Sequence, residues 1–228
     1  MTKKYTFISD THNKHSGLTS NSYDNILGSG DVLIHAGDCT SMGKSHEITN
    51  FLNWFGMTDF KHKIFIAGNH DFGFEMNADI AEEFKEKGII YLFDSEVVID
   101  GVKFYGSPWQ PEFYDWAFNL PRGEKLAEKW AKIPGDTDIL ITHGPAHGML
   151  DWTPSGQRVG CNDLFHRIME VQPKIHVCGH IHSSYGQKNF NGVEFLNASV
   201  LNERYEYENK PIKLVFDVEE KKIVEYYD

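Results

Sequence analysis

The stretch KIFIAGNHD, residues 63–71, decides the fold that the sequence predicts. Its first part, KIFIAG, is a short run of β-branched and aromatic residues of the kind that forms a buried strand. The run then changes abruptly to Asn69, His70 and Asp71, which are costly to bury unless they are paired. The sequence therefore predicts a central strand that ends directly in a cluster of polar, metal-binding or acid–base side chains.

The same pattern follows four other strand-like runs: YTFIS at 5–9, DVLIH at 31–35, DILITH at 138–143 and KIHVCGH at 174–180. The polar residues at or just after their ends are Asp10 with His12, Asp38, His143, and His180 with His182. Ligands of open α/β sheets bind at the carboxyl ends of the strands. Asp10, Asp38 and Asn69 are spaced by about 30 residues, the length of one βαβ unit. We therefore expect these clusters to meet in one crevice and to form a shared metal site.

Length and periodicity predict one α/β domain. The chain has 228 residues and 40% apolar residues, which suits a single domain over 1–228 with a full core. Apolar residues recur at helical spacing in four segments, at 48–55, 80–84, 126–130 and 164–168. Asp100-Gly101 predicts a tight hairpin turn, and residues 211–227 predict two further strands. The pattern indicates a parallel core extended by antiparallel strands.

Charge and composition exclude several classes of partner. The chain has 22 basic and 33 acidic residues, a net charge of −11, so a long nucleic acid is not expected to bind. No apolar run reaches the roughly 18 residues of a membrane span, so no membrane association is expected. The three cysteines form no CxxC pair, and the beginning, MTKKYTFISD, lacks the apolar stretch of a secretory signal. These features predict a cytoplasmic protein.

The ordered motifs DxH, GD, GNHD, H and GHxH resemble those of the calcineurin-like metallophosphoesterase superfamily, and every motif position is filled here. The segments HAGDCT, GSPWQPEF, ITHGPAHG and HVCGHIHSSYG further resemble the branch of metallophosphoesterase-domain-containing proteins, which is associated with class III cyclic-nucleotide phosphodiesterase-like activity. This resemblance implies a four-layer α/β/β/α sandwich with two mixed β-sheets.

The donor atoms suit divalent transition metals. Imidazole nitrogens with few carboxylates fit Mn²⁺, Fe, Zn²⁺, Ni²⁺ or Co²⁺ better than Mg²⁺ or Ca²⁺. The resemblance implies two ions, one held by Asp10, His12, Asp38 and His182 and the other by Asp38, Asn69, His143 and His180. The expected reaction is in-line attack on phosphorus by a hydroxide shared between the two ions.

Two residues of GNHD are predicted to take part in the reaction. His70 is expected to protonate the leaving oxygen, because an imidazole titrates near neutral pH. Asp71 is expected to orient His70 and to stabilise its charge. The alternative for each is a structural role in the turn.

The surroundings of the motifs favour a small phosphodiester, such as a cyclic nucleotide, as the substrate. A phosphomonoester dianion is usually met by arginines, and neither GDCTS nor AGNHD contains one. Trp109, Arg158 and His147 are predicted to contact the substrate, with packing or a solvated loop position as the alternative for each. A phosphomonoesterase, a nuclease or a metal-binding scaffold remain alternative functions.

Overall fold

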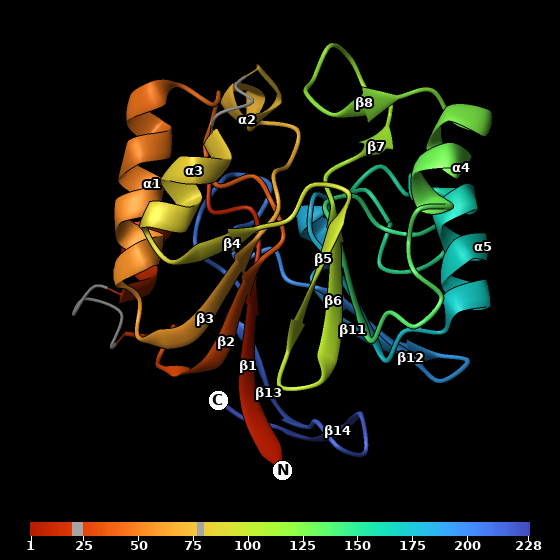
Figure 1. Cartoon of the computed structure of the whole chain (residues 1–228). Helices are drawn as coiled ribbons and strands as arrows, with labels where there is room; N and C mark the ends of the chain where they lie inside the picture. The colour runs from red at the N-terminus through yellow and green to blue at the C-terminus, as the bar shows by residue number, and fades with distance from the viewer. Residues whose placement is uncertain (20–24, 77–79) are drawn as a thin grey trace.

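The computed structural model describes residues 1–19, 25–76 and 80–228. Two six-stranded mixed sheets pack face to face, and helices cover the outer side of each (Figure 1). Helices α1, α2 and α3 lie on one outer side of the molecule, and α4 and α5 lie on the other. This is the α/β/β/α sandwich that the family resemblance implies, and the expected fold class is confirmed.

The first sheet has the strand order β14-β13-β1-β2-β3-β4. Its parallel strands are β1 (Thr2–Ile8), β2 (Gly30–His35), β3 (Phe60–Phe65) and β4 (Ile89–Tyr91). The antiparallel strands β13 (Ile212–Asp217) and β14 (Lys222–Tyr226) extend it, as the sequence of residues 211–227 predicts. The helices beside this sheet are α1 (Ser45–Met57), α2 (Phe72–Met76) and α3 (Ile80–Glu86), and a 3₁₀ helix, η1 (His15–Thr19), follows β1.

The second sheet has the strand order β11-β12-β10-β9-β6-β5. Its strands are β5 (Ser95–Ile99), β6 (Val102–Ser107), β9 (Ile139–Thr142), β10 (Ile175–Cys178), β11 (Gly186–Phe190) and β12 (Val193–Asn197). The helices beside it are α4 (Glu124–Trp130) and α5 (Asn162–Val171), and the 3₁₀ helix η3 (His182–Ser184) follows β10. Two short strands, β7 (Gln110–Pro111) and β8 (Asn119–Leu120), pair separately. The predicted hairpin joins β5 to β6 through Asp100 and Gly101, whose φ angles are 50° and 81°.

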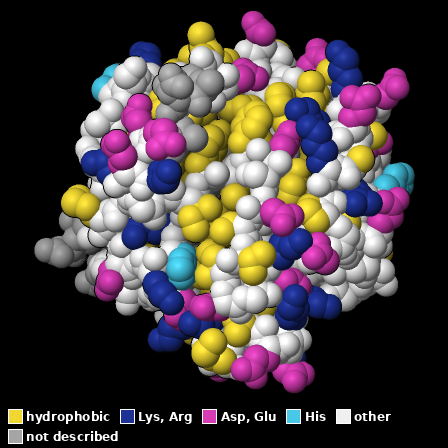
Figure 2. Space-filling model, viewed as in Figure 1, with side chains coloured by type: hydrophobic (Ala, Val, Ile, Leu, Met, Phe, Trp, Pro, Cys, Tyr) yellow, Lys and Arg dark blue, Asp and Glu magenta, His cyan; other side chains and the backbone are white. Residues whose placement is uncertain are grey.

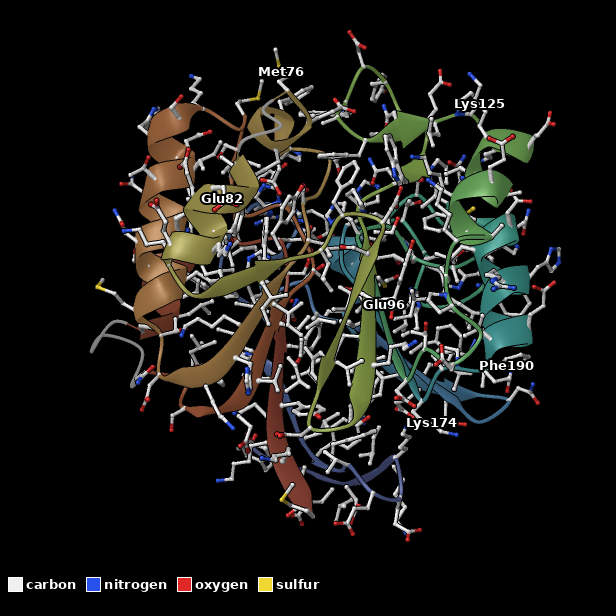
Figure 3. All side chains as sticks on the ribbon, in the orientation of Figure 1. Met76, Glu82, Glu96, Lys125, Lys174 and Phe190 are labelled. Atoms are coloured by element: carbon white, nitrogen blue, oxygen red, sulfur yellow. The ribbon has the colours of Figure 1, made fainter. Side chains whose placement is uncertain are left out.

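Three apolar clusters hold the four layers together. The cluster between the sheets contains side chains such as Tyr5, Phe7, Phe104 and Phe216. The other two lie between a sheet and its helices, and they contain the predicted apolar faces, among them Phe51 and Phe55 of α1, Leu126 and Trp130 of α4, and Leu164 and Ile168 of α5. Figure 3 shows side chains filling the space between the layers, whereas Glu82 and Lys125 lie on the outer helices. The helical periodicity of the sequence therefore marks the faces that pack against the sheets.

The surface carries mixed charges. On the face shown in Figure 2, hydrophobic side chains form a band over the edge strands β4 and β5, where the two sheets meet, and charged side chains lie to both sides of it. None of the helices that the described residues form is long and apolar enough to cross a membrane.

The packing of the two sheets brings the ends of their parallel strands together. The loop after β1 is held to the loop after β2 by a hydrogen bond from the Asp10 amide to the Gly37 carbonyl, at 2.9 Å. The loop after β10 is held to the end of β9 by the Gly179 amide, which donates to the His143 carbonyl at 3.0 Å. His143 also bridges the sheets, because its ring Nδ1 lies 2.9 Å from the Ala36 carbonyl oxygen. The polar clusters of the sequence therefore converge between the sheets.

Candidate metal centre

The loops that follow β1, β2, β3, β9 and β10 gather the predicted ligands around one space. Three groups of candidate ligand atoms each lie within 4.8 Å of one another: Asp10, His12 and His182; His12, Asp38 and His70; and Asp38, His143 and His180. Asn69 joins the third group, since its Oδ1 lies 2.9 Å from His143 Nε2. The structure thus brings together all seven predicted ligands, in two sets that meet at Asp38.

Asp38 faces both sets of ligands. Its Oδ2 lies 3.3 Å from His143 Nε2 and 3.8 Å from His12 Nε2. Its Oδ1 accepts a hydrogen bond from the His70 amide at 2.8 Å, which fixes the rotation of the carboxylate. Burial opposes ionisation of Asp38, but the neighbouring His143 outweighs it and holds the pKa of this carboxyl well below its usual range. A buried carboxylate with one oxygen aimed between two imidazoles is suited to bridge two cations.

Asp10 anchors the other set. Ser199 Oγ donates to its Oδ2 at 2.7 Å, and the His180 amide donates to the same oxygen at 3.0 Å. Its Oδ1 lies 3.4 Å from His182 Nε2. The site is fully buried, which disfavours a charged carboxyl, but His182 keeps the pKa of Asp10 well below its usual value. Asp10 is therefore held ionised and points at its histidine partner.

Backbone carbonyls orient two of the histidines. The ring Nδ1 of His143 lies 2.9 Å from the Ala36 carbonyl oxygen, and that of His182 lies 2.9 Å from the Asn202 carbonyl oxygen. A carbonyl can only accept, so each Nδ1 carries the proton and each Nε2 faces the carboxylates. Burial alone would lower the pKa of both rings. The carboxylate of Asp38 beside His143 and that of Asp10 beside His182 have the larger effect, so that the pKa of each ring is raised to about 9. Without metal, both rings are therefore protonated at neutral pH, and their positive charges lie beside the carboxylates.

The ring nitrogens of His12 show that the residues of the site fit a metal ion. Both of its ring nitrogens are buried, and neither has a hydrogen-bond partner among the described residues. Burial lowers the pKa of His12 to about 4 and that of His180 to about 3, so both rings are neutral at pH 7, the form that binds metals. Buried polar atoms are nearly always paired. A divalent cation between His12 and the carboxylates would satisfy the unpaired nitrogen, so the residues fit the metal that the motifs imply.

The backbone of the site is strained. Four of the seven candidate ligands have positive φ angles: Asp10 (56°), His12 (39°), Asp38 (56°) and His180 (67°). Such conformations persist only where the surroundings enforce them, and they cluster at functional sites. Glycines make room for the carboxylates, since a Cβ at Gly179 would overlap the Asp10 carboxylate and one at Gly68 would overlap that of Asp38. The local sequence is therefore shaped around the ligands.

His70 lies where the sequence predicts an acid. One of its ring nitrogens groups with His12 and Asp38. Its Nδ1 lies 2.8 Å from the Ser41 carbonyl oxygen and so carries a proton, which leaves Nε2 without a partner among the described residues. The indole of Trp116 supports the ring, with centroids 4.2 Å apart. His70 is held in one orientation beside the ligands with its second nitrogen available.

The structure corrects the role expected of Asp71. Its carboxylate accepts hydrogen bonds from the Gly68 amide at 2.8 Å, from the Thr40 amide at 2.9 Å and from Thr40 Oγ1 at 2.7 Å. Burial raises the pKa of Asp71 to about 6. Among the described hydrogen bonds, none joins it to the His70 ring, whose orientation is set by the Ser41 carbonyl. Asp71 instead ties the loop after β2 to the loop after β3, because the turn aims its side chain into the protein.

A cavity of about 280 Å³ opens onto the ligands. Its lining consists of five candidate ligands, His70, and aromatic, hydroxyl and acidic side chains: His12, Asp38, Asn69, His180, His182, Phe113, Trp116, Thr153, Pro154, Ile181, Ser183, Glu203 and Tyr205. Within the described part of the chain, no lysine or arginine belongs to this lining. The cavity is thus a metal site with aromatic walls and no positively charged side chain other than histidine.

The three residues predicted to contact substrate lie elsewhere. Trp109 donates from Nε1 to Asp94 at 3.0 Å and packs beneath Lys129, whose Nζ is 3.8 Å from the ring centroid. Arg158 is paired with Asp151 at 2.9 Å. His147 is a half-exposed loop residue, 3.8 Å from Asp151. All three are absent from the lining that the described residues form, because their own neighbours fix them away from the cavity.

The sequence does not single out the other side chains that line the cavity beside the ligands and His70. Phe113 and Trp116 belong to the aromatic stretch 106–119, but nothing in their spacing separates them from the packed Trp109 and Phe118. Tyr205 and Glu203 lie in the turn after β12, where the sequence carries no motif. Only the tertiary structure brings this turn beside the histidines.

Three buried histidines lie outside the candidate ligands. His35 Nε2 lies 3.0 Å from Thr11 Oγ1, and His176 Nε2 lies 2.8 Å from Thr142 Oγ1. Burial lowers the pKa of His35 and of His176 to about 3, and that of His15 to about 4. All three are therefore neutral in the folded protein over the whole range from pH 7 to pH 5.

Because of these histidines, we expect the metal-free protein to become less stable as the pH falls. In the unfolded chain they take up protons below a pKa of about 6.5, while the folded protein does not. The free energy of unfolding should therefore fall as the pH drops from 6.5 toward 4, by up to about 1.4 kcal/mol per pH unit for each histidine. Urea unfolding of metal-free protein at pH 7, 6 and 5 measures this slope, which should be shallower in His176→Gln. An identical slope in wild type and variant would contradict the prediction.

Comparison with known proteins identifies the family to which the chain belongs. The family model of calcineurin-like phosphoesterases matches residues 3–184. The chain is 42% identical over 233 residues to human metallophosphoesterase domain-containing protein 1, covering 92% of this chain and 69% of that protein. It is 36% identical to the UPF0046 protein T07D4.2 of Caenorhabditis elegans, covering 83% and 54%. The solved structure of TT1561 of Thermus thermophilus shares the fold, with a TM-score of 0.63 at 13% identity over 100% of this chain and 99% of that one. The chain therefore belongs to the calcineurin-like phosphoesterase family.

Proposed function

We propose that the protein is a dinuclear metal-dependent phosphodiesterase that hydrolyses a small phosphodiester such as a cyclic nucleotide. The observation that carries the proposal is the cavity in which two ligand sets meet at Asp38 and which, among the described residues, contains no lysine or arginine. Membership of the phosphoesterase family supports the reaction class.

The chain's residues divide between holding the metals and serving the substrate. Asp10, His12, Asp38 and His182 would hold one ion, and Asp38, Asn69, His143 and His180 the other. Ions such as Mn²⁺, Fe, Zn²⁺, Ni²⁺ or Co²⁺ supply Lewis acidity toward the phosphoryl oxygens and lower the pKa of a water molecule toward neutrality. The strained, hydrogen-bonded backbone keeps the donors in place before substrate arrives.

His70 donates the proton that the leaving oxygen needs. Nδ1 donates its hydrogen bond to the Ser41 carbonyl, so the proton that the charged ring can transfer is the one on Nε2. The ring lies beside Asp38 and His12, so a phosphoryl group bound at the metals would lie within its reach. Protonation of the leaving oxygen avoids the release of a costly alkoxide.

Charge favours a diester over a monoester. A phosphomonoester dianion carries one more negative charge than a diester and gains most from arginine or lysine. The cavity offers neither from the described residues, and the carboxylates of Asp38 and Glu203 lie in its lining. Two of the arginines are already engaged elsewhere, since Arg158 is paired with Asp151, and Arg122 donates to the Val159 and Gly160 carbonyls.

An adjoining cavity offers space for the organic part of the substrate. It also measures about 280 Å³, and it shares Phe113, Thr153, His180 and Ile181 with the metal cavity. Its remaining lining is Pro111, Glu112, Arg122, Gly144, Pro145 and Val159. A phosphoryl group at the metals would extend its organic substituent between these largely apolar walls. This favours a compact organic ester and supports a nucleotide.

Hydrolysis of two synthetic esters tests the proposal. With Mn²⁺ bound, bis-p-nitrophenyl phosphate should be cleaved at least about tenfold faster, in kcat/KM, than p-nitrophenyl phosphate, a difference of about 1.4 kcal/mol in transition-state stabilisation. Faster cleavage of the monoester would instead support a phosphomonoesterase, and cleavage confined to short oligonucleotides would support a nuclease. Metal binding without cleavage of any of these esters would support a scaffold.

A further inference from the structure

Tyr205 lies against two histidines of the metal centre, His12 and His182. Its ring centroid is 4.8 Å from that of His12 and 5.7 Å from that of His182, and it meets both rings edge to face. His70 meets His12 in the same way, at 4.7 Å. His12 is therefore flanked by two side chains that can donate a hydrogen bond, and both line the metal cavity.

The turn that carries Tyr205 is built to hold it there. Tyr205 has a φ of 59°, a strained conformation for an aromatic residue. Its amide donates to the Asn202 carbonyl at 2.8 Å, and Asn202 Oδ1 accepts the amides of Arg204 and Glu206 at 2.9 and 3.0 Å. The Lys14 ammonium donates to the Tyr205 carbonyl, which ties the turn to the loop of His12. Strain maintained by this many bonds indicates a required position.

The same turn is joined to the ligands. The Asn202 carbonyl that accepts the Tyr205 amide also lies 2.9 Å from His182 Nδ1. A ligand histidine and Tyr205 are thus oriented by one backbone group. The Tyr205 ring is therefore held at a fixed place beside the candidate ligands, in the lining of the cavity.

The Tyr205 hydroxyl has no hydrogen-bond partner among the described residues, and the residue is 41% exposed. Tyr205 lines a cavity whose described lining includes no lysine or arginine. A phosphoryl oxygen at the metals needs donors, and an uncharged phenol can supply one without favouring a dianion.

We propose that Tyr205 is a substrate-contacting residue whose hydroxyl donates a hydrogen bond to a non-bridging oxygen of the bound phosphodiester. The proposal rests on the function proposed above. Tyr205 and His70 both adjoin His12 and serve different oxygens of the ester, Tyr205 a non-bridging oxygen and His70 the leaving oxygen.

The test compares Tyr205→Phe with Tyr205→Ala. Tyr205→Phe keeps the ring beside His12 and removes only the hydroxyl, so metal content and thermal stability should stay at the wild-type level. The kcat/KM for bis-p-nitrophenyl phosphate should fall about 10- to 100-fold, the loss expected for a hydrogen bond to a charged group. Tyr114→Phe is the matched control, since Tyr114 is 79% exposed and absent from the cavity lining that the described residues form.

Binding of inorganic phosphate to the metal-loaded protein separates this inference from the function. Calorimetry should show weaker phosphate binding to Tyr205→Phe than to wild type and no change in Tyr114→Phe. If wild type cleaves no ester but this difference persists, the proposed function fails and the contact with Tyr205 stands. If Tyr205→Phe equals wild type in both assays while Tyr205→Ala is impaired, the ring only packs against the histidines and the inference is overturned.

Discussion

Replacing Asp38 with alanine is expected to lower kcat/KM for the diester by at least about 1,000-fold and to remove at least one metal ion. The reason is geometric, since Asp38 Oδ2 lies within 4 Å of both His12 Nε2 and His143 Nε2 and belongs to two of the three ligand groups. No other carboxylate among the described residues is shared in this way. Steady-state kinetics together with metal analysis of the purified variant measure both effects.

Two further variants separate the metal role of Asp38 from its structural one. Asp38→Asn keeps the acceptor for the His70 amide and should fold normally, yet it should still lose most activity because an amide carries no charge. Asp136→Ala removes a carboxylate that is 73% exposed and paired with Lys103, and it should behave as wild type. An Asp38→Ala protein that retains two metal ions and a tenth of the wild-type rate would refute the bridging role.

Replacing His70 with alanine should lower kcat/KM by about 100- to 10,000-fold for a diester with an alkoxide leaving group. For a p-nitrophenyl ester the loss should be much smaller, because p-nitrophenolate leaves without protonation. Metal content should be unchanged, since His70 is placed beside the two ligand sets and its Nδ1 is already engaged by the Ser41 carbonyl. The decisive measurement is the ratio of the two rate losses.

His166→Ala is the control for His70, because His166 is an exposed histidine on α5. It should leave both rates unchanged. A loss in His70→Ala that is equal for good and poor leaving groups would mean that His70 does not protonate the leaving oxygen. A loss of metal in the same variant would assign His70 to the ligands.

Much of the fold and of the ligand set follows from local sequence patterns. Strands such as β9 are short, buried and mostly apolar runs, and α1 has a continuous apolar face through Phe51 and Phe55. The polar residues after these strands could be picked out because side chains such as Asp38 and His180 are costly to bury, and because such residues follow five strands in the same way. Their convergence follows from the parallel order of the strands, which places the following loops at one edge of each sheet.

The residues that line the cavity were not predictable, because contacts between residues far apart in the sequence decide which side chains reach it. Arg158 carries the charge expected of a phosphate ligand, but the buried Asp151 and the ring of Trp152 hold it. Asp71 adjoins His70 in sequence, yet the turn aims its carboxylate at the Gly68 and Thr40 amides. Tyr205 shows the reverse case, since its turn bears no motif and reaches the histidines only in the folded chain.

The metal content of the purified protein tests directly whether the chain holds two metal ions that share Asp38. Wild type would be stripped with chelator, loaded with excess Mn²⁺ or Zn²⁺, freed of unbound metal and measured by mass spectrometry beside Asp38→Ala. A dinuclear centre should give about two ions per chain in wild type and at most one in the variant. A wild-type protein that retains no metal under either loading would rule out the metal centre and would leave this phosphoesterase fold as a scaffold.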